Sequence, residues 1–373
     1  MREIRLSDMD DIARGAAILG AGGGGDPYVG RLLAEVAIDR HGPVSLVDID
    51  DVPPDAVVVP VSAMGAPTVG AEKLPSGHEA IAALRALERV LGKQATHLVP
   101  IEIGGVNSVI PIAAAAETGL PLVDGDAMGR AFPEAHMVLP SLIGVSCTPM
   151  AIVDDKGNTM VLDTVDNRWA ERFARSVCTE AGCSVFTADT VLTGRQVKDG
   201  LVAGTLTLAH RLGRAVRLSP EPVATASALL DGHLLITGKV VDVDRATTGG
   251  FARGHARIDG IGAYRGARLT LSFQNEHLVA ERDGEIVTST PDLICVLDNE
   301  TGQPVTTEGM RYGNRVAILG VPCDSRWTTP AGLRLTGPRA FGYDHDYRPI
   351  VAEQPCGVGR SRGGASTFLG DNT

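Results

Sequence analysis

The chain has 373 residues, of which 44% are hydrophobic and 21% are charged. This length and composition are typical of a folded protein of about two domains and exclude a disordered chain. The formal net charge of −11 repels nucleic acid and anionic membrane surfaces, so we expect neither as a partner.

The first third of the chain alternates between predicted helices and predicted strands. Residues 7–20 are expected to be helical, although the apolar run 16–19 fits a short strand equally well. The segment 137–153 is expected to form two buried strands, because it is too short and too interrupted by proline to span a membrane. Apolar strands separated by helices favour a mainly parallel sheet covered on both faces. The other helices are predicted at 26–39, 76–91 and 107–118, and the other strands at 44–49, 57–62, 97–103 and 120–123.

The pattern changes after about residue 160, where strands and turns begin to dominate. Helices are still predicted at 166–181 and 205–218. The strands that follow are predicted at 234–244, 268–274, 278–282, 285–288, 293–297 and 315–319. We therefore predict an α/β protein with an N-terminal α/β domain (1–163) that contains a mainly parallel sheet. A C-terminal β-rich domain (164–352) and a disordered tail (353–373) follow it.

A run of glycines leads into the helix predicted at 26–39. It comprises Gly22, Gly23, Gly24 and Gly25. Backbone N–H groups at a helix N-terminus attract anions, and glycine lets a ligand approach the main chain. The segment also satisfies the G-x-G-x-x-G pattern of dinucleotide-binding folds, with Asp48 where a ribose-binding acid would lie. We interpret it as a substrate-binding loop, and a dinucleotide loop or a tight turn are the alternatives.

The strand predicted at 97–103 ends in a segment that contains Glu102 and Asn107. Ligands in open α/β sheets bind where strands end at their carboxyl edge, so both side chains are placed to reach one. For Asn107 the alternative role is to cap the helix that follows.

The next strand ends in a second acidic segment, which contains Asp124, Asp126, Arg130 and Glu134. These residues can act as general acid or base, as metal ligands or as a clamp for a carboxylate. A solvated acidic loop is the alternative. Because two successive strands end in acid-and-glycine segments, a functional site at this edge is favoured.

Cysteine and histidine spacing indicates no further site. The chain contains no C-x-x-C, H-x-H or H-E-x-x-H pair, so neither a zinc site nor a disulfide is expected, and we expect a cytoplasmic protein. Cys147 lies in an apolar segment, where free cysteine usually behaves as a small hydrophobic residue, and a catalytic nucleophile is the alternative. The polar residues of 238–245 and 273–276 fall in or beside predicted strands, where cross-strand pairs are the more common role and a site role is the alternative.

Nine segments in order resemble the S-methyl-thiohydantoin desulfurase family over about residues 5–350. They read LGAGGGGDPYVGR, MGAPTVGAEKLPSGHE, EIGGVNS, LVDGDAMGRAFPE, GKVVDVDRATTGGFARG, QNEHLVA, TPDLICVLD, RYGNRV and GPRAFGYD. The resemblance implies a hydrolase that acts on a five-membered cyclic imide-like ring. Members of the family resemble proteins found near or fused to hydantoinase/oxoprolinase enzymes. It implies hydrolytic desulfurisation of an S-methyl thiohydantoin with release of methanethiol. The alternatives are a nicotinamide-dependent oxidoreductase and a non-catalytic subunit or binding protein of a hydantoinase-type enzyme.

That reaction needs a base for water and groups that hold the ring. Asp124 or Asp126 is the expected base, either directly or through a divalent metal ion that Glu102 would help to bind. The amides of the four glycines, Arg130 and Glu134 are expected to bind the substrate, and Asn107 to donate hydrogen bonds to its ring. The expected partners are a small cyclic substrate and further copies of the chain in a homo-oligomer.

Overall fold

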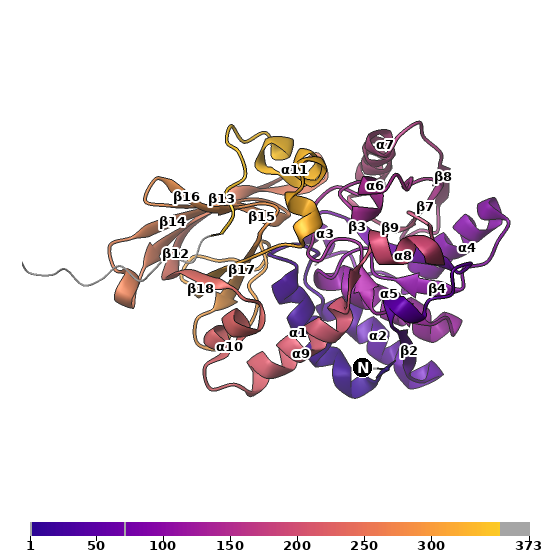
Figure 1. Ribbon diagram of the computed structural model, residues 1–373, viewed down its shortest axis with the longest axis horizontal. Coiled ribbons are helices and arrows are strands. Elements are labelled where there is room, and N and C mark those ends of the chain that lie inside the picture. The colour runs from indigo at the N-terminus through magenta and orange to yellow at the C-terminus, as the bar shows by residue number, and fades with distance from the viewer. Residues whose placement is uncertain (1, 71, 351–373) are drawn as a thin grey trace, which may run out of the picture.

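A computed structural model describes residues 2–70 and 72–350. The chain forms an α/β part, indigo to magenta in Figure 1, which lies beside an antiparallel β part drawn in orange. The predicted fold class is thereby confirmed. The tail predicted at 353–373 lies outside the described residues.

The first sheet has a parallel centre and antiparallel margins. Its parallel strands are, in spatial order, β2 (Val44–Val47), β5 (Leu122–Val123), β4 (His97–Val99) and β3 (Val57–Gly65). Parallel neighbours need long crossovers, which here are helices. The antiparallel strands are β1 (Glu3–Ile4) next to β2, then β9 (Ser184–Ala188), β7 (Met150–Asp154) and β8 (Thr159–Leu162) beyond β3, with β10 (Leu192–Thr193) pairing with the start of β3.

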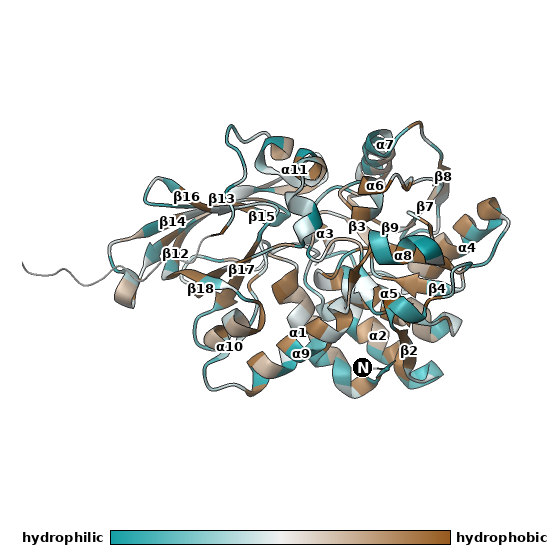
Figure 2. Ribbon diagram, in the orientation of Figure 1, coloured by the Kyte–Doolittle hydropathy of each residue, from teal (hydrophilic) through white to brown (hydrophobic). Residues whose placement is uncertain are grey.

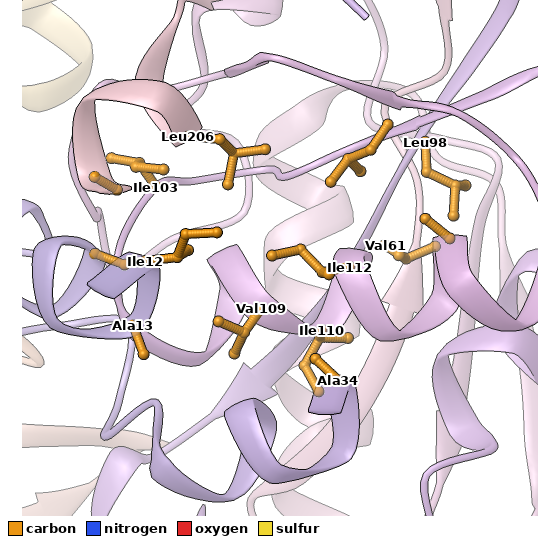
Figure 3. Close-up of a cluster of buried hydrophobic side chains, with 14 of the residues drawn as sticks. Ile12, Ala13, Ala34, Val61, Leu98, Ile103, Val109, Ile110, Ile112 and Leu206 are labelled. Carbon is orange, nitrogen blue, oxygen red and sulfur yellow. The ribbon is translucent and has the colours of Figure 1, made fainter. Parts of the chain in front are cut away.

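Successive residues of each strand face opposite layers of helices. Val59 and Val61 of β3 pack into one core, whereas Val58 packs into the other. The first layer contains α1 (Met9–Leu19), α2 (Tyr28–His41), α4 (Glu79–Leu91), α5 (Gly105–Thr118) and α9 (Thr205–Leu218), and Figure 3 shows side chains of α1, α2 and α5 meeting in its core. The second layer contains α7 (Asn167–Glu180) and α8 (Gly194–Gly200), the latter largely teal in Figure 2.

The second sheet is entirely antiparallel. Its strands are, in spatial order, β16 (Glu285–Ser289), β15 (Glu276–Arg282), β14 (Arg268–Gln274), β13 (Phe251–Gly260), β12 (His233–Thr248), β18 (Arg315–Val321) and β17 (Leu293–Asp298). Leu293 and Leu297 of β17 join the same core as α1, so the two parts share buried apolar surface. The remaining short α-helices and strands are α3 (Pro67–Gly70), α6 (Leu139–Leu142), α10 (Pro222–Leu229), α11 (Pro330–Thr336), β6 (Gly125–Asp126) and β11 (Val202–Ala203).

Three local predictions differ from the structure. The run 16–19 is helical, so the short strand considered there is wrong. The strand predicted at 97–103 ends at Val99, because the N–H of Ile103 binds the Asp126 carboxylate instead of a neighbouring strand. The segment 137–153 holds one strand and the short helix α6, in whose first turn Pro140 is tolerated.

Residues beyond 164 continue to build the α/β part. Helices α7, α8 and α9 and strand β9 pack on or join the first sheet, although the predicted division assigns them to the C-terminal domain. The division itself stays a prediction. In the parts of the chain that the structure describes, no helix combines the length and apolarity needed to cross a membrane, and the cysteines are free.

Candidate functional site

A cavity of about 280 Å³ opens at the carboxyl end of β3 and β4. Its walls come from the glycine loop before α2, the end of β3, the loop after β4, the start of α5, strand β9 and the segment 132–135. Residues of 66–70 and 73–75, Arg175 of α7 and, at the turn between β14 and β15, Asn275 and Glu276 also line it. The cavity therefore lies where the two parts of the protein meet.

Glu102 lines the cavity as a buried carboxyl group. Its Oε1 accepts a hydrogen bond of 2.7 Å from Asn107 Nδ2, and among the described residues Oε2 has no hydrogen-bond partner. Burial raises the pKa of Glu102 to about 8, and the nearby charge of Asp126 adds to this effect. The group therefore exchanges its proton near neutral pH.

Asn107 connects the end of β3 to the loop after β4 through side-chain hydrogen bonds and does not cap α5. The N-cap residue of α5 is Gly104, so the capping role considered for Asn107 is wrong. Its side chain donates to Glu102 Oε1 and to the carbonyl of Ala63, and its Oδ1 accepts from the N–H of Ala63 at 2.7 Å. Asn107 thus fixes Glu102 relative to the end of β3.

Glu276 is a second buried carboxyl group in the same cavity. Burial raises its pKa well above the usual range, and the charge of Glu102 raises it further, against the opposing effect of Arg130. Within the described residues its Oε2 also lacks a hydrogen-bond partner. Two like charges buried in one site cannot easily coexist, so the pair holds at least one proton. The only sequence signal for Glu276 is the polar run 273–276.

The glycine loop packs closely against the start of β15 and also lines part of the cavity. A Cβ on Gly22 would lie 2.5 Å from the His277 ring, and one on Gly23 would lie 2.0 Å from Glu276 Oε1. Gly24 and Gly25 line the cavity, whereas Gly22 and Gly23 do not.

The context of this loop differs from that of a dinucleotide site. Helix α1, not a strand, leads directly into Gly20, so the strand–loop–helix order of a dinucleotide fingerprint is not met. Asp48 caps the short helical turn that follows β2 and does not line the cavity. The dinucleotide interpretation of the loop is therefore wrong.

Asp126 lies beneath the cavity wall rather than in it. Its Oδ2 accepts from the backbone N–H groups of Ile103, Met128 and Gly129 at 3.1, 2.9 and 2.7 Å. Burial outweighs these bonds and raises its pKa to about 7. Asp126 therefore ties the loop that carries Glu102 to the segment that follows β6.

Asp124 lies away from the cavity, at the N-terminus of α9. Its carboxylate accepts from the N–H and the hydroxyl of Thr207. Thr207 is in the first turn of α9, where N–H groups lack partners within the helix. Asp124 thus acts as a helix cap supplied by a distant segment.

The predicted metal ligands do not converge. No group of three or more His, Cys, Asp or Glu side chains suited to a metal ion occurs in residues 2–70 and 72–350. Asp126 uses one oxygen on backbone N–H groups, and Asp124 faces α9. The expected set of Glu102, Asp124 and Asp126 is therefore not assembled as a metal site.

Arg130 is fully buried and bound to main-chain carbonyls, so it does not offer its charge to the cavity. It donates to the carbonyls of Ala131, Pro291 and Asp292 at 2.7–2.9 Å, and its guanidinium lies 4.6 Å from the centre of the Phe132 ring. Arg130 joins the α/β part to the β part, and the expected contact with an anionic substrate group is not available.

Glu134 lines the cavity on the side of α7, as expected of a substrate-binding residue. Burial and the charge of Glu171 raise its pKa. Arg175, also in the lining, donates to Glu171 at 2.8 Å and lies 4.1 Å from the centre of the Phe251 ring. The charge of Arg175 is thus already paired with a carboxylate of the protein, and Lys73, which also lines the cavity, lies 2.8 Å from Asp155 Oδ1.

Three lining residues have no sequence signal. Ser62, Thr187 and Asp189 come from β3 and from β9 and its end, and they form consecutive hydrogen bonds. Burial raises the pKa of Asp189, against the effect of the hydroxyl groups of Thr190 and Thr187. In the sequence these residues cannot be distinguished from ordinary strand positions, so only the structure shows that they line the cavity.

The geometry defines a two-part α/β protein with a carboxyl-lined cavity between its parts. Family models described as "S-Me-THD-like, N-terminal domain" and "S-Me-THD-like, C-terminal domain" match residues 7–164 and 165–350. The chain therefore belongs to the S-methyl-thiohydantoin desulfurase-like family.

Comparison with individual proteins adds the fold alone. No curated protein matches the chain. The crystal structure of a protein from Chromobacterium violaceum is similar to it, with 24% sequence identity, a TM-score of 0.78 and coverage of 94% of this chain and 100% of that chain.

Proposed function

We propose that the protein is a hydrolase that removes sulfur from a thiohydantoin-type five-membered ring, with an S-methyl thiohydantoin as its substrate. The observation that carries the proposal is the pair of buried carboxyl groups, Glu102 and Glu276, in one cavity. Membership of the S-methyl-thiohydantoin desulfurase-like family supports the substrate class.

The two carboxyl groups are suited to opposite roles. Glu102, with a pKa of about 8, loses its proton as the pH rises towards 8, and the ionised group acts as the base for water. Glu276, with a pKa well above the usual range, keeps its proton and acts as the acid. Asn107 positions Glu102 through the bond to Oε1, which leaves Oε2 for water.

The reaction is a hydrolytic substitution at the ring carbon that bears sulfur. Glu102 accepts a proton as the water oxygen bonds to that carbon, while Glu276 donates a proton to the ring nitrogen whose double bond opens. The carbon–sulfur bond then breaks as the carbonyl forms. The proton on Glu102 leaves with sulfur as methanethiol, and the second water proton restores Glu276. The products are one hydantoin and one methanethiol.

Turnover of a defined ring tests this proposal. Purified protein is incubated with an S-methyl thiohydantoin and with its unmethylated thiohydantoin, and volatile thiol and hydantoin are followed by mass spectrometry. We expect methanethiol and hydantoin in equal amounts, and kcat/KM that rises with pH until Glu102 is ionised near about pH 8. Glu102→Gln and Glu276→Gln are each expected to lower turnover by at least about 100-fold.

An exposed carboxylate provides the matched control. Glu300 lies on the surface of the β part, so Glu300→Gln should turn over the ring at the wild-type rate. Absence of product from both rings would contradict the proposal. In that case, activation of a separate hydantoinase-type enzyme by this protein would support the role of a non-catalytic subunit instead.

A further inference from the structure

Three side chains of the cavity wall form a continuous chain of hydrogen bonds that the proposed reaction does not use. Ser62 Oγ lies 2.9 Å from Thr187 Oγ1, which lies 2.8 Å from Asp189 Oδ2. All three residues line the cavity and are buried. Ser62 and Thr187 are direct partners in the β3–β9 ladder, so the sheet itself fixes their contact.

Asp189 sets the direction of these bonds. Its Oδ2 accepts from Thr187, and its Oδ1 accepts from Thr190 Oγ1 at 2.6 Å. A hydroxyl group has one hydrogen to donate. Because Thr187 donates its hydrogen to Asp189, Ser62 is the donor in the bond to Thr187. The Ser62 oxygen is then left with lone pairs only, and it can accept from a molecule in the cavity but cannot donate to it.

We propose that Ser62 Oγ is the acceptor for a ring N–H of the ligand, so that the cavity selects cyclic amides and imides that are unsubstituted at that nitrogen. The ring class rests on the proposed function. Thr187 and Asp189 are positioning residues, since they act on the ligand only through the direction of the Ser62 hydroxyl. A ring alkylated at this nitrogen lacks the donor and leaves the buried Ser62 oxygen without that hydrogen bond.

The binding of hydantoin and its N-methyl derivatives tests this subsite without any reaction. The affinities of hydantoin, 1-methylhydantoin and 3-methylhydantoin are measured by calorimetry for the wild type, Ser62→Ala, Thr187→Val and the double variant. We expect one methylhydantoin to bind the wild type at least about 10-fold more weakly than hydantoin. Each single variant should weaken the binding of hydantoin by about 3- to 10-fold and leave that of the weaker methylhydantoin unchanged.

Thr187→Val separates hydrogen bonding from space. Valine has nearly the shape of threonine, so this variant frees the Ser62 hydroxyl without enlarging the cavity. In the double variant Thr187→Val should add nothing to Ser62→Ala, because the positioning effect passes through the missing hydroxyl. Ser176→Ala is the matched control. Ser176 is exposed on α7 and does not line the cavity, and its hydroxyl donates to the carbonyl of Arg172, so its replacement should not change the affinity for any of the three ligands.

Two results would overturn the subsite. One is the absence of saturable hydantoin binding by the wild type, and the other is an equal effect of the variants on hydantoin and on both methylhydantoins. Methanethiol release, measured on the same wild-type sample, distinguishes this failure from that of the proposed function. Selective binding of hydantoin without methanethiol release would refute the proposed function and support the subsite. Methanethiol release without selective binding would support the proposed function and refute the subsite.

Discussion

Replacing Glu102 by glutamine should remove a large part of the pH dependence of stability. Burial raises the pKa of Glu102 from 4.5 to about 8 in the folded chain. Between these values the folded protein holds a proton that the unfolded chain has lost. The free energy of unfolding therefore falls as the pH rises from about 4.5 to about 8, and it levels off above that range.

The size of this effect follows from the same change in pKa. Each pKa unit corresponds to about 1.4 kcal/mol, so the full change from 4.5 to about 8 corresponds to about 5 kcal/mol. Between pH 5 and pH 8 the wild type should lose about 4 kcal/mol of stability that Glu102→Gln does not lose. Glutamine keeps the shape and the hydrogen bond to Asn107 but carries no titrating proton.

Urea unfolding at a series of pH values measures this difference. The fluorescence of the fully buried Trp327 reports on tertiary structure, and far-UV circular dichroism reports on secondary structure. If the two transitions coincide, the free energy of unfolding can be extracted from them. The difference between wild type and variant reports the proton on Glu102 together with the effect of its charge on the neighbouring Glu276 and Asp126, and it cancels the more distant titrating groups. Glu300→Gln should give a profile parallel to that of the wild type. Parallel profiles for Glu102→Gln as well would refute the assignment of a proton to buried Glu102.

Three further predictions follow from the placement of individual residues. Asp124→Ala removes the cap of α9 and should lower stability by about 1 kcal/mol, measured as a lower melting temperature, with turnover unchanged; loss of turnover would return Asp124 to the site. Gly23→Ala puts a Cβ 2.0 Å from Glu276 Oε1, so it should lower the free energy of unfolding by about 1–3 kcal/mol and also reduce kcat. The control Gly200→Ala meets only ordinary van der Waals contacts and should change neither quantity. Burial raises the pKa of Cys147 to about 12, so the native protein should resist alkylation there and Cys147→Ala should keep full turnover; rapid labelling would contradict this.

Most helices and strands could be predicted from the sequence because the signals that mark them are local. The helix predicted at 26–39 begins beside Asp26 and Pro27 and is observed as α2, and the helix predicted at 166–181 begins at its cap residue Asp166 and is observed as α7. Caps and apolar periodicity act within a few residues, so they can be recognised without the fold. Strand β13 lacked such a signal, because several of its positions hold Gly or Ala in place of larger apolar residues.

The candidate site could be predicted only in part. Glu102, Asn107 and Glu134 follow strands of the parallel sheet and do line the cavity, because the carboxyl ends of parallel strands meet at one edge. Asp124 and Asp126 occur in the same segment, yet one caps α9 and the other binds backbone N–H groups. Neighbouring positions in a loop point in different directions, and the sequence does not encode those directions locally.

The sequence alone thus determined the fold class, the glycine loop and the strand edge at which a site would form. Only the tertiary structure decided that Glu276, from the β part, faces the same cavity as Glu102 and that both are buried. The physical reason is that a carboxyl group's pKa depends on how much water and charge surround it. Those surroundings are set by segments from opposite ends of the chain, which come together only when the two parts pack.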